Sequence, residues 1–338
     1  MRSLGVGYSR HVIPEEHWKI CKTETSTPVQ REYDKAADRR NPPRIVLSNE
    51  QIRSFHAKGF LTLPAITTAE EVVRLRVVFG RLAETRAGFN EGAQFDLVSG
   101  DDSNGPLTLL EIMNPVDYAP ELRNTLFHIN ARAIAKQLLG RAAAPFFEHG
   151  IMKPARHGGA TPWHQDEAYR ADGNFNYRQL AIWMPLQPVD LQNGCMQYLP
   201  GTHHGPLLAH RSPNDNSRVH ALECSPYLNA NSAIACPLPA GGCTIHDGRT
   251  LHYAGPNYSH SARWAYILNF DLPPKPHWEK QAFPWNEEKQ TAHALRREAW
   301  YKQGGFVLDL YRRLRRGVPV HPHRLFYLMC RAWRSVLR

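Results

Sequence analysis

The second half of the chain alternates short apolar runs with turn residues. Runs of strand length, rich in large apolar residues, recur at 144–153, 179–186, 194–199, 242–247 and 264–271. Glycine and asparagine pairs separate them, among them Gly173-Asn174, Asn193-Gly194 and Gly241-Gly242. Short strands divided by such turns predict a double-stranded β-helix, the jelly-roll barrel of cupin-like proteins.

The residues before these runs have helical spacing instead. Ser48 is suited to cap a short helix that continues through Ala57 and ends at Gly59. Apolar residues three or four positions apart predict two longer helices at 69–86 and 120–139. Two shorter segments complete this part, an alternating strand at 60–63 and a loop near the site at 87–106. The fold class is therefore mainly β with helical additions.

Composition and charge divide the chain into three parts. Residues 1–46 are polar and lack periodicity, which predicts an arm that lies over the domain or has no fixed structure. The barrel with its helical preface takes residues 47–275. Residues 276–338 form an extension of amphipathic helices with arginines expected on the outer face. The net charge is +10, but 291–338 holds eleven Lys/Arg and two Asp/Glu, so the remaining chain is close to neutral.

Cysteine usage and hydropathy bound the compartment. The six cysteines include no Cys-x-x-Cys pair, which argues against a structural zinc site and a disulfide framework, so we expect reduced, buried thiols. No run of about 18 apolar residues occurs, and the N-terminus lacks the apolar core of a signal peptide. These features predict a cytoplasmic protein, with peripheral membrane contact only through the basic extension.

A metal motif stands in the strand-like segment 161–166. His164 and Asp166 are two residues apart. Alternate residues of a strand share a face, so both side chains are able to ligate one metal ion. This pair supplies two ligands of a metal site that needs a third.

The third ligand is expected from another strand-like segment beside glycines, where His252 is the candidate. His246, His203 and His204 compete with it. Two histidines and one carboxylate make the facial triad of non-haem Fe(II) oxygenases, which leaves coordination positions open for a co-substrate and dioxygen. Arg263, eleven residues after His252, is able to hold a carboxylate through its guanidinium.

Four pieces of the sequence occur in one order: 164–166 (His-Gln-Asp), 193–203, 250–257 and Arg263. In this order they resemble the phytanoyl-CoA dioxygenase family of Fe(II)/2-oxoglutarate-dependent oxygenases. Residues 47–52 and 59–64 look like the opening helix and strand of that family, so the resemblance covers residues 47 to about 272. A lone His-x-Asp pair is a weak signal, whereas four pieces in register are a strong one.

The resemblance implies a cofactor set and a role for each motif residue. His164, Asp166 and His252 would bind Fe(II), and Arg263 would hold the distal carboxylate of 2-oxoglutarate. Dioxygen would be the second co-substrate. His252 takes the distal ligand position of the family, which favours it over the competing histidines.

The resemblance also implies a lining for the 2-oxoglutarate pocket, formed by Gln165, Trp183 and His149. One position departs from the family pattern. Many members have a serine two residues after the distal histidine, where this chain has Ala254. A hydrogen bond to the co-substrate is therefore absent or supplied by another residue.

The implied reaction is hydroxylation of an unactivated aliphatic C–H bond, with decarboxylation of 2-oxoglutarate to succinate and CO₂. Related halogenases replace the carboxylate ligand by a small residue, and Asp166 is present here. Desaturation, epimerisation and cyclisation begin with the same hydrogen abstraction and stay open. The rival interpretations are a cupin-type dioxygenase or isomerase without 2-oxoglutarate, and a non-catalytic cupin-like binding protein.

Substrate and partners are less constrained by the sequence. The variable loops 87–106, 167–177 and 205–232 favour an apolar or ring-containing small molecule, because they contain Phe89, Phe95, Tyr169, Phe175, Tyr177 and Tyr227. The basic tail 306–338 is interpreted as a charged helix pair packed on the barrel, or as a contact surface for a membrane or an acidic partner such as an acyl carrier protein. Nucleic acid is not expected as a partner, and the sequence leaves the oligomeric state open.

Overall fold

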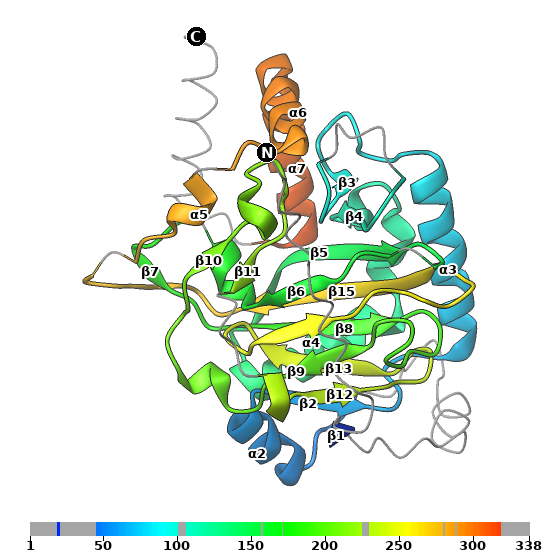
Figure 1. The fold of residues 1–338 in the computed structure, drawn as a ribbon, viewed down its shortest axis with the longest axis vertical. Coiled ribbons are helices and arrows are strands. Elements are labelled where there is room, and N and C mark those ends of the chain that lie inside the picture. The colour runs from blue at the N-terminus through cyan, green and yellow to red at the C-terminus, as the bar shows by residue number, and fades with distance from the viewer. Residues whose placement is uncertain are drawn as a thin grey trace, which may run out of the picture.

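The computed structural model describes residues 19–20, 45–100, 106–156, 158–170, 172–224, 230–279, 281–287 and 289–318. Two mainly antiparallel sheets face each other in this part of the chain (Figure 1). The large sheet contains β2 (Phe60–Leu63), β3 (Gln94–Asp96), β4 (Leu110–Met113), β5 (Ala144–Lys153), β8 (Gln179–Pro185), β13 (Cys243–Asp247) and β15 (Arg263–Asp271). The small sheet contains β1 (Lys19–Ile20), β6 (Thr161–His164), β9 (Met196–Tyr198), β12 (Ile234–Cys236) and β14 (His252–Ala254).

The strand order confirms the predicted jelly-roll architecture. The large sheet runs β2-β13-β8-β15-β5-β4-β3, and the small sheet runs β1-β12-β9-β14-β6. Two short pairs lie outside these sheets, β7 (Phe175–Asn176) with β16 (Lys275–Pro276) and β10 (His210–Arg211) with β11 (Glu223–Cys224). The five predicted strands are present as β5, β8, β9, β13 and β15.

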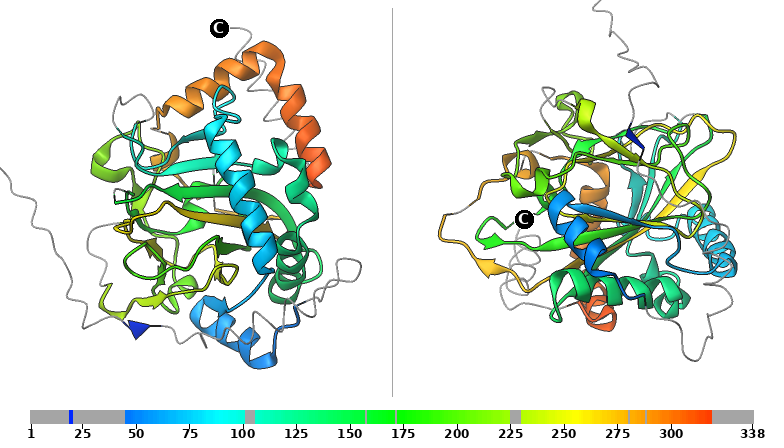
Figure 2. Two further views of the ribbon diagram at one scale, coloured as in Figure 1. Left: turned by 90° about the vertical axis from the view of Figure 1, so that its right-hand side faces the viewer. Right: turned by 90° about the horizontal axis from the view of Figure 1, so that it is seen from below.

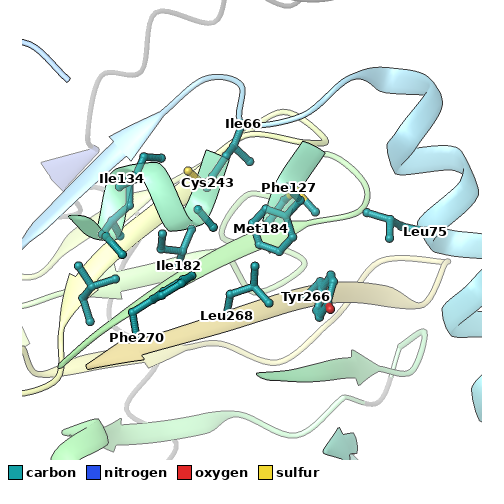
Figure 3. Close-up of a cluster of buried hydrophobic side chains, with 14 of the residues drawn as sticks. Ile66, Leu75, Phe127, Ile134, Ile182, Met184, Cys243, Tyr266, Leu268 and Phe270 are labelled. Atoms are coloured by element: carbon teal, nitrogen blue, oxygen red, sulfur yellow. The ribbon is translucent and has the colours of Figure 1, made fainter. Parts of the chain in front are cut away.

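Strand β15 is apolar on both faces because both faces are covered. Its inward side chains include Ala265 and Ile267, which share a cluster with Trp183 between the two sheets. Its outward side chains pack under helices in a second cluster and include Trp264, Tyr266, Leu268 and Phe270. Figure 3 shows part of this outer cluster, with Leu268 and Phe270 beside Met184 and Phe127. Apolar contacts therefore cover both faces of β15, those with the other sheet on the inside and those with the helices on the outside.

Three helices supply that support: α2 (Asn49–Lys58), α3 (Ala69–Glu84) and α4 (Leu126–Leu139). Helices α3 and α4 cover the outer face of the large sheet (Figure 2). Helix α2 begins with the predicted Ser48 cap, which forms a capping box with Gln51, and ends at Gly59 with a φ of 83°.

Two predicted boundaries were wrong. The helix expected over 120–139 is divided, because a 3₁₀ turn covers Pro120–Asn124 and the extended Thr125 caps α4 with its hydroxyl. The loop expected over 87–106 contains β3, which pairs with β4 at the edge of the large sheet. Both differences come from contacts that local spacing does not encode.

The extension contains α5 (Pro284–Glu287), α6 (Ala292–Trp300), a π-helical turn at Tyr301–Gly305 and α7 (Phe306–Arg316). In Figure 1, α6 and α7 lie beside β3 and β4. The arginines of α7 were expected on its outer face, which is correct for the exposed Arg315 but wrong for Arg312 and Arg316. Arg312 pairs with Glu91 and Arg316 with Asp117, so these two face the protein, while Tyr311 and Leu314 are 54% and 60% exposed.

The remaining sequence expectations are only partly covered by the structure. Of the arm 1–46, β1 pairs in parallel with β12 at the edge of the small sheet. The second amphipathic segment of the extension and Tyr227 lie outside the described residues. The four described cysteines, Cys195, Cys224, Cys236 and Cys243, are free and buried. No helix in the described ranges is long and apolar enough to cross a membrane.

Candidate active site

The three proposed metal ligands converge at the small sheet. His164 ends β6, and His252, the first residue of β14, pairs with it directly across the two strands. Asp166 lies beyond the strand, as the first residue of a 3₁₀ turn, Asp166–Tyr169. The extended backbone of Gln165 (φ −118°, ψ 130°) nevertheless keeps the two-residue alternation. One ligand atom from each of His164, Asp166 and His252 lies within 4.8 Å of the others.

Hydrogen bonds to the backbone fix both imidazoles in one tautomer. Nδ1 of His164 lies 2.7 Å from the Pro162 carbonyl, and Nδ1 of His252 lies 2.8 Å from the Thr250 carbonyl. A carbonyl oxygen only accepts, so each Nδ1 carries the hydrogen and each Nε2 presents a lone pair. Both Nε2 atoms face Asp166 Oδ1, at 3.5 Å and 3.4 Å.

The charges of the cluster suit a divalent cation. Burial alone would raise the pKa of Asp166, but the facing imidazoles of His252, His164 and His246 hold it well below its usual range. Burial and the neighbouring His252 lower the pKa of His164. One carboxylate and two imidazoles therefore meet at one point, which is the donor set that Fe(II) accepts in the facial triad.

The predicted co-substrate anchor, Arg263, is buried inside the same barrel with 2% exposure. Neither its Nε nor its Nη1 has a hydrogen-bond partner among the residues that the structure describes. Burial lowers the pKa of this guanidinium to about 10. A buried cation with unsatisfied donors is costly unless an anion pairs with it. The site therefore fits a ligand carboxylate at this position.

A buried lysine lies opposite Arg263. Lys153 of β5 pairs in register with Arg263 of β15 and is fully buried. Its Nζ donates to the carbonyls of Ala254 and Gly255, at 2.8 Å and 2.6 Å. Burial and the charge of Arg263 lower its pKa well below the usual range. Lys153 thus ties β5 to the strand that carries His252.

Two of the three predicted pocket residues share the inner face of the large sheet. Trp183 of β8 and His149 of β5 both pair with Ile267 of β15, so the three side chains stand in one row. Trp183 lies under Arg263, with 5.4 Å between the guanidinium carbon and the indole centroid. His149 Nδ1 lies 2.9 Å from Glu111 Oε1.

The third, Gln165, points away from this row. Its amide nitrogen donates to the carbonyls of Arg249 at 2.8 Å and Pro206 at 3.3 Å, and its oxygen accepts from Leu208 N at 2.8 Å. The side chain is buried and holds the chain near residue 206 against the β13–β14 connection.

Residues 55–265 match the model of the family described as Phytanoyl-CoA dioxygenase (PhyH). The chain belongs to the phytanoyl-CoA dioxygenase family.

Similar sequences and a similar solved structure agree with this assignment. The chain is 27% identical over 229 residues to a probable alpha-ketoglutarate-dependent hypophosphite dioxygenase of Stutzerimonas stutzeri, covering 65% of this chain and 77% of the relative. It is 30% identical over 283 residues to the peroxisomal phytanoyl-CoA dioxygenase of Bos taurus, covering 80% of each. The structure of EvdO2 from Micromonospora carbonacea var. aurantiaca, complexed with 2-oxoglutarate, superposes with a TM-score of 0.61 and 34% identity, covering 72% of this chain and 98% of EvdO2. The protein is therefore a 2-oxoglutarate-dependent non-haem iron dioxygenase.

The family match ends at residue 265, yet the extension beyond it contacts the turn that begins with Asp166. Trp285 Nε1 and Asn286 Nδ2 donate to the Ala168 carbonyl at 2.9 Å and 2.7 Å, two residues after Asp166. From the other side, Arg249 donates to the buried Glu167 through Nε and Nη2, at 2.7 Å and 2.8 Å. Contacts from the extension and from Arg249 therefore hold the turn that begins with Asp166.

The extension also completes a wall of rings, defined here as Phe95, Tyr169, His220 and His293. His293 of α6 stacks on Phe95 with 3.8 Å between centroids and meets His220 edge-on at 4.7 Å. Tyr169 stacks on His220 at 5.6 Å and contacts the ring of His164 at 5.8 Å. The wall thus begins at a proposed metal ligand and ends on the extension.

Burial keeps both wall histidines neutral. It lowers the pKa of His293 to about 3 and the pKa of His220 well below its usual range. Sequence reasoning named Phe95 and Tyr169 as loop aromatics but missed both histidines. His293 lies in a segment whose spacing indicates only a basic helix, so no local signal marked it.

His246 was considered as a rival metal ligand, and the structure places it beside the carboxylate instead. Its Nε2 lies 3.1 Å from Asp166 Oδ2, on β13 of the large sheet. His203 and His204 lie elsewhere, in the 3₁₀ turn Thr202–His204, where the ring of His203 faces the His56 carbonyl.

Proposed function

We propose that the protein hydroxylates an unactivated aliphatic C–H bond of a small molecule, with His164, Asp166 and His252 binding Fe(II) and Arg263 binding 2-oxoglutarate. The observation that carries this proposal is the buried guanidinium of Arg263, whose Nε and Nη1 have no hydrogen-bond partner among the described residues, in the same barrel as the three-ligand cluster. A binding protein without 2-oxoglutarate chemistry would have no use for a buried cation with two unsatisfied donors.

Each ligand has a defined task in this proposal. His164 and His252 offer Nε2 lone pairs held in place by the Pro162 and Thr250 carbonyls, and Asp166 offers Oδ1. Iron bound there, with 2-oxoglutarate and dioxygen, supplies the oxidation that inserts one oxygen atom into the substrate C–H bond and the other into succinate, releasing CO₂. Because Asp166 fills the position that a halide would need, hydroxylation is favoured over halogenation.

The co-substrate pocket follows from the row of inner-face residues. Arg263 would hold the distal carboxylate, with Trp183 and His149 as side walls. Gln165 would act through the residues near 206 that its amide holds, because its donors and acceptor are already used there.

The substrate is proposed to be ring-containing or apolar, and the wall of rings supports this. Aromatic and neutral imidazole faces bind apolar rings, and imidazole nitrogens can also hydrogen-bond substrate hydroxyl groups without adding charge. Asp166 is the most exposed of the three ligands, with 22% of its side chain exposed compared with 6% for His164 and 4% for His252. Substrate would therefore approach from the side of the carboxylate.

The decisive experiment needs no substrate. Fe(II) and then 2-oxoglutarate are added without oxygen to folded apoprotein, and a weak visible metal-to-ligand charge-transfer band is expected. Iron-loaded protein that gives no band with 2-oxoglutarate would favour the 2-oxoglutarate-independent or non-catalytic interpretations.

The same preparation then identifies the outcome of the reaction. Candidate substrates are screened for succinate formation, and the product mass is compared with that of the substrate. A gain of one oxygen indicates hydroxylation, a loss of two hydrogens indicates desaturation or cyclisation, and an unchanged mass with new stereochemistry indicates epimerisation. Only the first outcome agrees with the proposal.

We assign the catalytic unit to residues 47–275 and the extension to 276–338. Membrane or acidic-partner contact, if it is a function of the tail, would use the exposed Arg315 and basic residues beyond 318, because Arg312, Arg313 and Arg316 are engaged with Glu91, Asp309 and Asp117. Deletion of residues 319–338 should then weaken binding to anionic vesicles, and unchanged binding would exclude a role for these residues.

A further inference from the structure

The two carboxylate oxygens of Asp166 face different neighbours. Oδ1 lies 3.5 Å from His164 Nε2 and 3.4 Å from His252 Nε2, so it points into the ligand cluster. Oδ2 lies 3.1 Å from His246 Nε2, on the opposite side. His246 is not one of the three residues whose ligand atoms lie within 4.8 Å of one another. The carboxylate is thus held by one oxygen from each side.

His246 is itself fixed by a buried polar chain. The Tyr198 hydroxyl lies 3.0 Å from His246 Nδ1 and 2.7 Å from Thr244 Oγ1. Thr244 and Tyr198 are fully buried, and His246 is 2% exposed. The ring of Tyr198 stacks on Phe60, with 4.6 Å between centroids and 12° between planes. These three side chains cannot rearrange without disturbing the barrel interior.

Hydrogen bonds orient the ring of His246. A carboxylate oxygen only accepts, so Nε2 carries the hydrogen that faces Asp166 Oδ2. On the other side of the ring, Nδ1 lies 3.0 Å from the Tyr198 hydroxyl, which donates its hydrogen to Thr244 Oγ1. Tyr198 and Thr244 therefore hold the imidazole in the orientation that points Nε2 at Asp166.

We infer that His246 is a positioning residue that keeps Asp166 monodentate, and that Tyr198 and Thr244 hold its ring in place. The inference rests on the proposed function, because it assumes that Asp166 is an iron ligand. Without the hydrogen bond to Oδ2, the carboxylate is free to rotate and to present both oxygens to the cluster. A bidentate carboxylate would occupy a position that 2-oxoglutarate needs for chelation.

The test compares His246→Leu, His246→Gln and Tyr198→Phe with wild type and with His204→Leu, which removes an exposed histidine outside the site. Each folded variant is titrated with Fe(II) and then with 2-oxoglutarate in the absence of oxygen, and the charge-transfer band is recorded. Thermal melts show whether each variant is folded.

His246→Leu should bind Fe(II) and 2-oxoglutarate about 10- to 100-fold more weakly, with a diminished or shifted band. His246→Gln retains an amide donor and should recover much of both affinities, which a purely structural role would not produce. Tyr198→Phe should cause a smaller, few-fold loss, because one contact that orients the ring is lost but the imidazole remains. His204→Leu should match wild type.

Two results would overturn the inference. A folded His246→Leu variant with wild-type affinities and band would show that Oδ2 needs no partner. Complete loss of iron binding in both His246 variants would show that His246 is a ligand and not a positioning residue. Absence of a band in wild-type protein would instead count against the proposed function, so the two failures are distinguishable.

Discussion

The two sides of the active site are built in different ways. The metal side uses residues 161–166 and 244–263, which lie within the family match, and each histidine ligand is oriented by a carbonyl two residues before it. The wall of rings joins β3, the chain near His220 and helix α6, which are far apart in sequence. Part of it lies beyond the family match.

This difference indicates where chemistry and selectivity reside. A ligand set with local orientation can be kept while the opposite wall changes, because the wall depends on packing between distant segments. We therefore expect changes on the metal side to affect iron and 2-oxoglutarate, and changes in the wall to leave both unaffected. The following predictions test that separation, beginning with the largest effect.

Asp166→Ala should have the largest effect. It removes the only carboxylate of the three-residue cluster and leaves two buried imidazoles. We expect Fe(II) affinity to fall more than about 100-fold and coupled turnover to be abolished. Anaerobic Fe(II) titration measures the effect, with Asp215→Ala as a control at an exposed aspartate. Unaltered turnover in Asp166→Ala would refute the ligand assignment.

Arg263→Ala should separate iron from co-substrate. Loss of the buried guanidinium should weaken 2-oxoglutarate binding by about 2–4 kcal/mol, or roughly 30- to 1,000-fold, because a charge-assisted bidentate contact is lost. Iron affinity should stay within about threefold of wild type. Arg263→Lys keeps the charge but not the planar geometry, and it should recover part of the affinity. An unchanged KM for 2-oxoglutarate would contradict the role of Arg263.

His293→Leu should affect the wall alone. The stack on Phe95 is lost, and we expect the free energy of unfolding to fall by about 1 kcal/mol. The affinities for Fe(II) and 2-oxoglutarate should be unchanged. Leu295→Ala changes an exposed residue of the same helix and serves as the control. A His293→Leu variant with a weakened charge-transfer band would break the proposed separation of the two sides.

The last prediction concerns the pH dependence of stability. Burial lowers the pKa of His293 to about 3, with smaller contributions from the charges of Arg296, Arg297 and Lys289, and the adjacent His220 also has a lowered pKa. The unfolded chain protonates this histidine below about 6.5, whereas the folded protein does not. The stability contribution of neutral His293 is therefore present above pH 6.5 and is lost as the pH falls toward 3.

The free energy of unfolding should fall by up to about 1 kcal/mol per pH unit below 6.5 on account of His293. Thermal midpoints at pH 7.5, 6 and 5 measure this dependence. The slope should be flatter in His293→Leu than in wild type. Equal slopes would remove His293 from the explanation.

Much of the barrel and of the metal side could be predicted from sequence. The bounds of β5 and β15 agree with the predicted runs to within one residue, because turn residues flank continuous apolar segments. His164 and Asp166 could be paired because two-residue alternation survives beyond the end of β6. Arg263 followed from its spacing to His252.

The wall and the orientation of the extension could not be predicted. Arg312 and Arg316 of α7 face inward because they pair with Glu91 and Asp117, which are more than 190 residues away in the chain. An amphipathic pattern shows that two faces of a helix differ. It does not show which face packs on the protein, because carboxylates from distant segments can pair with the arginines. The stack of His293 on Phe95 depends in the same way on a distant partner.

The contacts of Trp285 and Asn286 with the Ala168 carbonyl bear on how this enzyme can be engineered. A chimera that grafts another extension onto this barrel would replace two clamps on the turn that begins with Asp166, along with one ring of the wall. Under the proposed function, exchange of the extension would alter substrate preference and loosen the carboxylate of Asp166 together. Libraries that vary the extension should keep 284–287 fixed and begin at residue 289.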